Sequence, residues 1–357
     1  NDQVMQEMKD LLSLLTSSEP AFRTYEEALP ALRATCADHP LASWYELGAS
    51  EEGRPFGGVV LGDGPITASL IAGNHADEPV GPATLFALIE GLLSRPETYA
   101  PLLEQVTFAI VPHTNPDGAA RNRPWIEAWP DLAAFLEHRV RELPGRDLEF
   151  GYPGMRPENE HVAQFLRAHG PFALHMSLHG MSASEGAMLL INRPWTFRTQ
   201  PLRDAFRAAA AEAGLPMHDH NRKGEKGFFW IEPGFTTTPR GDAMRTFFRA
   251  QDDEAMAERF HQSSMEFVMS LGGDPLCVVT ELPLFLIPND NPTPGRPERY
   301  LAFKDRLPEA KHRLSQDEPI DDLIAPFKVR PLPLATAVRL QIRALELGLK
   351  AVGVARG

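Results

Sequence analysis

The chain has 357 residues, a formal charge of −13, 43% hydrophobic residues and 23% charged residues. This composition supports a sizeable core and argues against global disorder. The negative charge argues against a surface for nucleic acid or anionic membranes, and no apolar run is long enough to span a bilayer.

The two cysteines, Cys36 and Cys277, lack the spacing of a metal or redox motif, so we expect buried thiols in a reducing compartment. No signal peptide is visible, which predicts a cytoplasmic protein. A removed leader stays open, because the chain begins at Asn1 rather than at Met.

The first 35 residues predict one or two amphipathic helices. We expect residues 1–40 to form a helical segment that packs on the core of a domain comprising residues 41–357. Residues 43–47 and 55–61 then predict a pair of strands.

The stretch from residue 67 to residue 93 organises the rest of the chain. Residues 67–72 predict a buried strand, and residues 81–93 have the apolar spacing of a helix. His75 and Glu78 lie on the turn between them, where α/β sheets often place a site. An imidazole and a carboxylate at this spacing can share a zinc ion if a third ligand comes from elsewhere, although such a pair alone is more often structural.

The next predicted strand, residues 105–111, leads into the turn Asn115-Pro116-Asp117-Gly118, with arginines close behind it. His75-x-x-Glu78 followed by this turn resembles the zinc metallocarboxypeptidases of the carboxypeptidase A type, which are related in fold to succinylglutamate desuccinylase and aspartoacylase. The resemblance covers about residues 43–282. We therefore expect a single α/β/α sandwich with a mixed, mostly parallel sheet, and a carboxypeptidase-like catalytic domain over residues 41–357.

The resemblance implies a third metal ligand, a histidine, at the end of a later strand. Residues 171–180 form such a predicted strand, which ends at His179-Gly180. His175 lies on the same face of that strand, but the family pattern Ser-x-His, through Ser177, favours His179. The resemblance thus implies one zinc ion held by His75, Glu78 and His179.

Residues 146–150 resemble the family's Asp-x-Asn-Arg stretch with an important departure. Asp147 is present, and by resemblance it accepts a hydrogen bond from His75 and fixes the imidazole tautomer. The Asn and Arg that grip a substrate carboxylate align with Glu149 and Phe150, which cannot do so. The sequence therefore predicts amide hydrolysis more firmly than removal of a C-terminal residue.

Two later loops contain polar candidates. His218-Asp219-His220 is a rival metal spacing, but its polar surroundings favour an exposed loop. Residues 234–241 predict a loop over the site, where carboxypeptidases carry a tyrosine. None of the five tyrosines lies between His179 and the next motif, so Arg240 or a threonine hydroxyl is the candidate for contacting the substrate there.

The buried strand predicted over residues 276–282 ends on Glu281, and an acid in that position is costly to bury without a use. The resemblance makes Glu281 the catalytic glutamate, a general base and then a general acid; a capping or ion-paired acid is the alternative. Arg123, or its competitor Arg121, is the candidate for stabilising the developing oxyanion. Residues 331–357 predict a closing helix.

We therefore predict a zinc-dependent hydrolase that acts on a peptide. An acyl-amino-acid deacylase is the main alternative, and a non-enzymatic zinc- or peptide-binding protein is a weaker one. The oligomeric state is not predicted.

Overall fold

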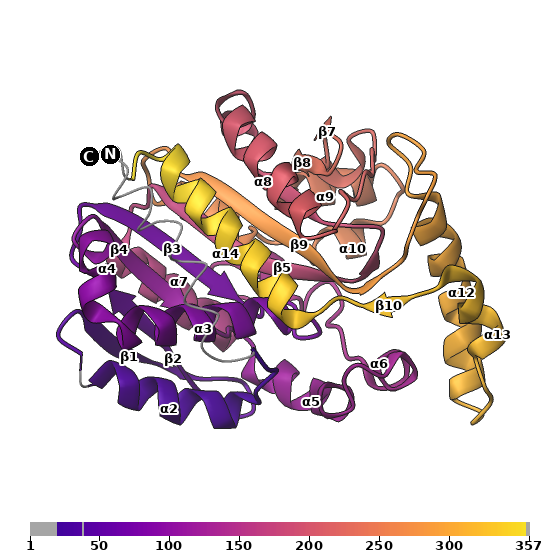
Figure 1. The fold of residues 1–357 in the computed structure, drawn as a ribbon, viewed down its shortest axis with the longest axis horizontal. Helices are drawn as coiled ribbons and strands as arrows, with labels where there is room; N and C mark the ends of the chain where they lie inside the picture. The colour runs from indigo at the N-terminus through magenta and orange to yellow at the C-terminus, as the bar shows by residue number, and fades with distance from the viewer. Residues whose placement is uncertain (1–19, 38, 355–357) are drawn as a thin grey trace.

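The computed structural model describes residues 20–37 and 39–354, so the part of the helical prediction for residues 1–35 that falls on residues 1–19 lies outside the described part of the chain. The described residues form a ten-stranded sheet in the order β1-β2-β4-β3-β5-β9-β6-β8-β7, with β10 paired to β9 (Figure 1). The strands are β1 (Ala42–Ala49), β2 (Pro55–Leu61), β3 (Ile66–Ala72), β4 (Val106–Val111), β5 (Leu174–Ser184), β6 (Met188–Ile191), β7 (Trp230–Glu232), β8 (Phe235–Thr237), β9 (Leu276–Leu286) and β10 (Arg330–Pro331).

The centre of the sheet is parallel and its flanks are mixed. Strands β4, β3, β5 and β9 run in one direction, whereas β2 and β6 pair antiparallel on either side. Parallel strands are covered by helices on both faces, which explains why β3 and β9 read as nearly continuous apolar runs. The carboxyl ends of β3 and β5 meet at one edge, and the site lies there.

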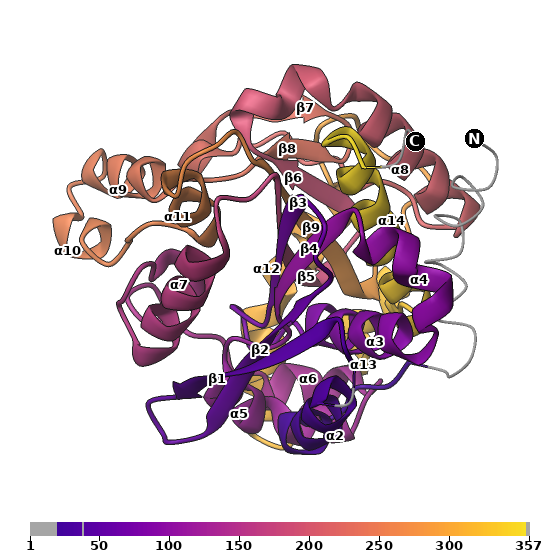
Figure 2. The same ribbon diagram turned by 90° about the vertical axis from the view of Figure 1, so that its left-hand side faces the viewer.

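Helices cover both faces of the sheet. They are α2 (Tyr25–Ala37), α3 (Val80–Ser94), α4 (Pro96–Leu103), α5 (Pro116–Glu127), α6 (Leu132–His138), α7 (Pro157–His169), α8 (Gln200–Glu212), α9 (Gly241–Arg249), α10 (Glu254–Ala257), α11 (Ser264–Ser270), α12 (Glu298–Leu314), α13 (Asp321–Ile324) and α14 (Leu334–Ala351). Seen along the sheet, α3, α8 and α14 lie on one side and α7 and α11 on the other (Figure 2). The predicted α/β/α sandwich is confirmed.

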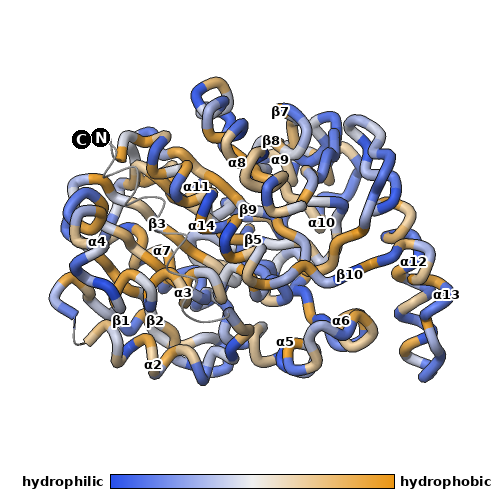
Figure 3. Tube along the Cα trace, viewed as in Figure 1, coloured by the Kyte–Doolittle hydropathy of each residue, from blue (hydrophilic) through white to orange (hydrophobic). Residues whose placement is uncertain are grey.

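Hydrophobic segments concentrate in the central strands and the helices against them, whereas the projection formed by α12 and α13 is largely hydrophilic (Figure 3). In the described part of the predicted N-terminal segment, α2 packs Leu29 and Leu32 into the main core. The boundary at residue 40 stays a prediction. None of the helices in the described ranges has both the length and the hydrophobicity that crossing a bilayer requires.

Two predicted boundaries are wrong, because pairing extends the strands. The strand expected to end at His179-Gly180 continues to Ser184, and the strand carrying Glu281 continues to Leu286. The two strands stay in parallel register over this extension, from Met181 opposite Pro283 to Ser184 opposite Leu286.

The helix α14 carries one buried amide that ties the strand ends together. Gln341 donates from Nε2 to the His179 carbonyl and to Thr280 Oγ1, each at 3.0 Å, and its Oε1 accepts a 2.5 Å hydrogen bond from Thr84 of α3. These three buried hydrogen bonds connect α14 to β5 at His179, to β9 at Thr280 and to α3 at Thr84.

Candidate active site

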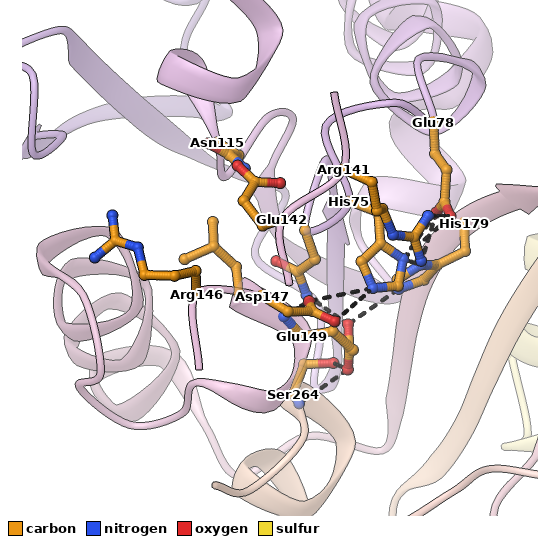
Figure 4. Close-up of polar contacts among 12 residues, drawn as sticks. His75, Glu78, Asn115, Arg141, Glu142, Arg146, Asp147, Glu149, His179 and Ser264 are labelled. Atoms are coloured by element: carbon orange, nitrogen blue, oxygen red, sulfur yellow. Dashed lines mark hydrogen bonds and ion pairs between the residues drawn. The ribbon is translucent and has the colours of Figure 1, made fainter. Parts of the chain in front are cut away.

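Three predicted ligands meet where β3 and β5 end against α3. His75 Nδ1 lies 3.1 Å from Glu78 Oε1, His179 Nδ1 lies 2.9 Å from Glu78 Oε2, and the two Nδ1 atoms are 3.0 Å apart. Figure 4 shows the three side chains pointing toward one another.

This donor set fits a single zinc ion. Ligands at ordinary zinc bond lengths in a tetrahedral arrangement lie about 3.3 Å from one another, close to the separations observed here. Among the described residues, His75, Glu78 and His179 are the one group of three or more such side chains whose ligand atoms all lie within 4.8 Å of one another. Two nitrogens and a carboxylate are also the chemistry that zinc prefers.

Small residues allow this close approach. Gly81, in the first turn of α3, faces the carbonyl oxygen of Leu178, and a Cβ atom there would lie only 2.3 Å from that oxygen. Because no side chain intervenes, the start of α3 rests directly on β5. Glu78 is thereby placed beside His179 and accepts a 3.2 Å hydrogen bond from the backbone N–H of Gly180.

Each histidine is held from behind by a carboxylate. His75 Nε2 lies 3.2 Å from Asp147 Oδ1, the contact that the resemblance implies. His179 Nε2 lies 3.0 Å from Glu149 Oε2 and 2.8 Å from Ser177 Oγ. A proton on Nε2 leaves Nδ1 of each ring free to bind a metal, so both carboxylates favour the required tautomer.

Glu149 is more deeply engaged than the sequence indicated. Besides His179 and Ser177, its carboxylate accepts hydrogen bonds from Asn74 Nδ2 at 2.5 Å and from the N–H and Oγ of Ser264 at 3.0 and 2.5 Å. Burial alone would raise the pKa of Glu149, but the hydrogen bonds from His179, Ser264 and Asn74 outweigh it and lower the pKa to about 2. Glu149 is therefore an ionised structural acceptor.

Glu281 stands beside the ligands on the neighbouring strand. It is the register partner of His179 in the parallel pair β5–β9, so both side chains point to the same face of the sheet. Its Oε2 atom has no hydrogen-bond partner. Burial, and then repulsion from Glu78, raises the pKa of Glu281 to about 8, which suits a group that exchanges protons near neutral pH.

The structure does not bring the three predicted arginines to the ligands. Arg123 is exposed on α5 and pairs with Glu127, and Arg121, also exposed on α5, pairs with Glu52 in the loop between β1 and β2. Arg240 precedes α9, is exposed, and pairs with Asp242. None of them lines the cavity that His75 and His179 border.

The arginine that lies against the candidate ligand group is Arg141, which the sequence did not indicate. Its Nη1 atom lies 2.6 Å from Glu78 Oε1 and 3.0 Å from Asp77 Oδ1. Burial disfavours the charge, but Glu78 and Asp77 raise the pKa of Arg141 above its ordinary value. The signal in the sequence was an arginine six residues before Asp147, at the end of an otherwise irregular segment.

The two rival histidine sites differ from the ligand group. His175 is buried, with Nδ1 2.8 Å from Ser69 Oγ. His218 is also buried rather than exposed as expected, and its Nδ1 accepts from the backbone N–H of Glu185 at 3.3 Å. Asp219 accepts from Trp230 at 2.8 Å, so it serves the loop rather than a metal.

The site opens into a cavity of about 340 Å³. Its lining includes His75, Asp147, Glu149, His179 and Glu281, together with Arg141. The rest of the lining is largely apolar and basic: Phe150, Leu190, Arg222, Lys226, Phe228, Met244, Phe248, Phe260 and Met265.

Residues 29–208, half of the chain, match the family model described as zinc carboxypeptidase. The chain is 34% identical over 104 residues to carboxypeptidase B of Astacus astacus, a match that covers 28% of this chain and 34% of that protein. The chain thus spans about a third of the length of this curated relative.

Two solved structures share the fold. A metallo-carboxypeptidase of Burkholderia cenocepacia aligns with a TM-score of 0.51 and 17% identity over 93% of this chain and 70% of that one. A carboxypeptidase A of Helicoverpa armigera aligns with a TM-score of 0.51 and 14% identity over 99% of this chain and 81% of that one.

Proposed function

Because the chain belongs to the zinc carboxypeptidase family, we propose that it is a zinc-dependent hydrolase that cleaves a peptide or amide bond. The observation that carries the proposal is the convergence of His75, Glu78 and His179 on one point, with Glu281 in register beside them. A scaffold that only binds metal has no use for that fourth, unpaired acid.

One ion held by these three ligands would keep a position open for water. When bound, zinc polarises a carbonyl and lowers the pKa of water from roughly 15.7 toward about 7. The protein's own contribution begins with Asp147 and Glu149, which orient the two imidazoles.

Glu281 and Arg141 would carry the proton and the charge. Glu281 Oε2, which has no partner, takes the proton of the attacking water and returns it to the leaving nitrogen. Glu78 and Asp77 hold the Arg141 guanidinium at the same cavity. We propose Arg141, in place of Arg123 or Arg121, as the cation that stabilises the developing negative charge on the substrate oxygen.

The substrate is a peptide or, as a second candidate, an N-acyl amino acid. Glu149 is saturated by protein donors, and Phe150 packs on Phe260 with ring centres 5.5 Å apart. Neither residue is available to bind a substrate's terminal carboxylate. This favours an amide hydrolase that reads its substrate elsewhere in the cavity, which keeps the deacylase open.

The test joins metal analysis to a substrate screen. We expect about one zinc ion per purified chain and hydrolysis products from a mixed library of peptides and N-acyl amino acids, read by mass spectrometry. Glu281→Gln should keep the zinc and lose turnover, while Glu346→Gln, an equivalent change at a buried acid of α14, should keep both. Undiminished turnover in Glu281→Gln would contradict the mechanism.

A further inference from the structure

The turn between Asn221 and Phe228 contributes Arg222, Lys226 and Phe228 to the lining of this cavity, and its backbone is strained. Lys223 and Lys226 have φ values of 53° and 55°, in the left-handed region that non-glycine residues seldom adopt. The turn is fixed from outside, because Thr237 Oγ1 donates to the Gly227 carbonyl at 3.0 Å. Strain that the surroundings maintain in this way is concentrated at functional positions.

Two cationic side chains of this turn, those of Arg222 and Lys226, lie at the cavity. Arg222 and Lys226 line it together with His75 and His179. Lys226 Nζ lies 4.9 and 5.2 Å from the ring centres of Phe247 and Phe248, and the Arg222 guanidinium lies 4.0 Å from the ring centre of Phe228.

These cations differ from Arg141 in how they are compensated. Arg141 is neutralised by Asp77 and Glu78, whereas Arg222 has one exposed partner, Glu225, at 3.1 Å. Within residues 20–37 and 39–354, Lys226 forms no ion pair, and its charge rests against aromatic faces. A cation held at a cavity wall without a carboxylate is ready to accept one from a ligand.

On the basis of the proposed hydrolysis, we propose that the substrate carries a carboxylate that pairs with Lys226 and Arg222. The enzyme then acts on acidic peptides or acidic N-acyl amino acids, and these two residues take the place of the family's Asn-Arg pair. The reacting amide then lies at His75, His179 and Glu281 and the carboxylate at Lys226 and Arg222, so these two groups of side chains orient the substrate.

The neighbouring space fits a substrate longer than one residue. A second cavity of about 1,050 Å³ shares Lys226, Thr238 and Met265 with the first, and rings such as Phe229 and Phe247 line it. Lys226 therefore stands where the two cavities meet. The carboxylate at Lys226 is that of a side chain if the substrate extends into the second cavity, and that of a chain terminus if the substrate ends at Lys226.

The test uses four probes that differ only in charge: N-acetyl-Phe-Glu and N-acetyl-Phe-Gln, each as the free acid and as the C-terminal amide. The zinc-loaded wild type should prefer at least one carboxylate-bearing probe over the neutral one by about 10- to 100-fold in kcat/KM, the range for a charge-assisted hydrogen bond. Lys226→Met should remove most of this preference, chiefly through KM. Lys223→Met is the matched control, because this exposed lysine has the same left-handed backbone and does not line the cavity.

A binding arm separates this proposal from the proposed function. The same probes are titrated by calorimetry into zinc-loaded Glu281→Gln, alone and combined with Lys226→Met. Tighter binding of the acidic probes that Lys226→Met abolishes supports the carboxylate subsite, even if the wild type hydrolyses none of them and the hydrolase proposal fails. Equal binding and turnover of neutral and acidic probes by the wild type would overturn the proposal. A preference for acidic probes that survives in the double variant with Lys226→Met and Arg222→Gln would also overturn it.

Discussion

Replacing Glu149 by glutamine tests whether a buried carboxylate sets the geometry of the metal ligands. The two side chains have nearly the same shape, so the change removes charge and one acceptor while leaving the volume unchanged. Glutamine turns an NH₂ group either toward His179, Asn74 and Ser177 or toward the N–H of Ser264. In both orientations at least one donor faces another donor.

The structure sets the expected size of the effect. Loss of an outer carboxylate behind a ligand histidine typically weakens metal binding by about 10- to 100-fold, or roughly 1.4 to 2.7 kcal/mol. Glu149 receives five hydrogen bonds, and breaking a buried charged network costs about 3–5 kcal/mol of folding free energy. Glu149→Gln should therefore lower both zinc affinity and the melting temperature of the metal-free protein.

Zinc affinity is measured by competition with a chromogenic chelator, and stability by thermal unfolding with and without metal. Glu142→Gln is the matched control: the Glu142 side chain is 8% exposed and accepts a 2.7 Å hydrogen bond from Asn115, but it touches no candidate metal ligand. We expect this control to lose stability and to keep its zinc affinity. Unchanged zinc affinity in Glu149→Gln, with the control behaving as expected, would refute the role assigned to Glu149.

Three further predictions follow from the same geometry. Arg141→Met should lower kcat by about 100-fold, the usual effect of losing a donor to the developing oxyanion, whereas Arg123→Met on the surface of α5 should leave steady-state kinetics unchanged; equal losses would contradict this assignment. Burial lowers the pKa of His113 from 6.5 to about 4, so below pH 6.5 the unfolded chain binds a proton that the folded protein does not. Urea unfolding across pH should show wild-type stability, relative to His113→Gln, constant above pH 7 and falling by about 3 kcal/mol in total between pH 6.5 and 4; a difference that is constant over this range would argue against it. Gly81→Ala should push α3 away from the Leu178 carbonyl and lower both the melting temperature and zinc affinity, and a stabilised variant would show that the contact relaxes freely.

Much of the fold was predictable because its strands are long apolar runs bounded by turns. The His75–Glu78 turn, the strand of His179 and the strand of Glu281 all lie where the patterns predict them. The parallel register that places Glu281 beside His179 was not predictable, because it depends on pairing between residues about 100 positions apart.

The predicted arginines Arg121 and Arg123 lie away from the site for a local reason. The turn after β4 is also a helix start: Asn115 caps α5 by accepting from Gly118 N–H at 2.9 Å, and Pro116 is its first residue. The helix carries Arg121 and Arg123 outward on its solvent-facing surface. Arg141 reaches the ligands through an irregular segment, for which the sequence has no periodicity to follow.

The role of Glu149 was hidden for another reason. From the sequence it is only a negative charge in a position where the family has an amide. Its donors, Asn74, Ser177 and Ser264, come from separate elements, and only the folded chain brings them together.

The amide of Gln341 connects α14 to β5 at His179 and to β9 at Thr280, the residue before Glu281. The ribosome adds His179 and Thr280 to the chain well before Gln341, and until α14 packs, the His179 carbonyl and the Thr280 hydroxyl lack this partner. The strand ends beside the candidate ligands therefore gain these hydrogen bonds only once α14 has packed against them.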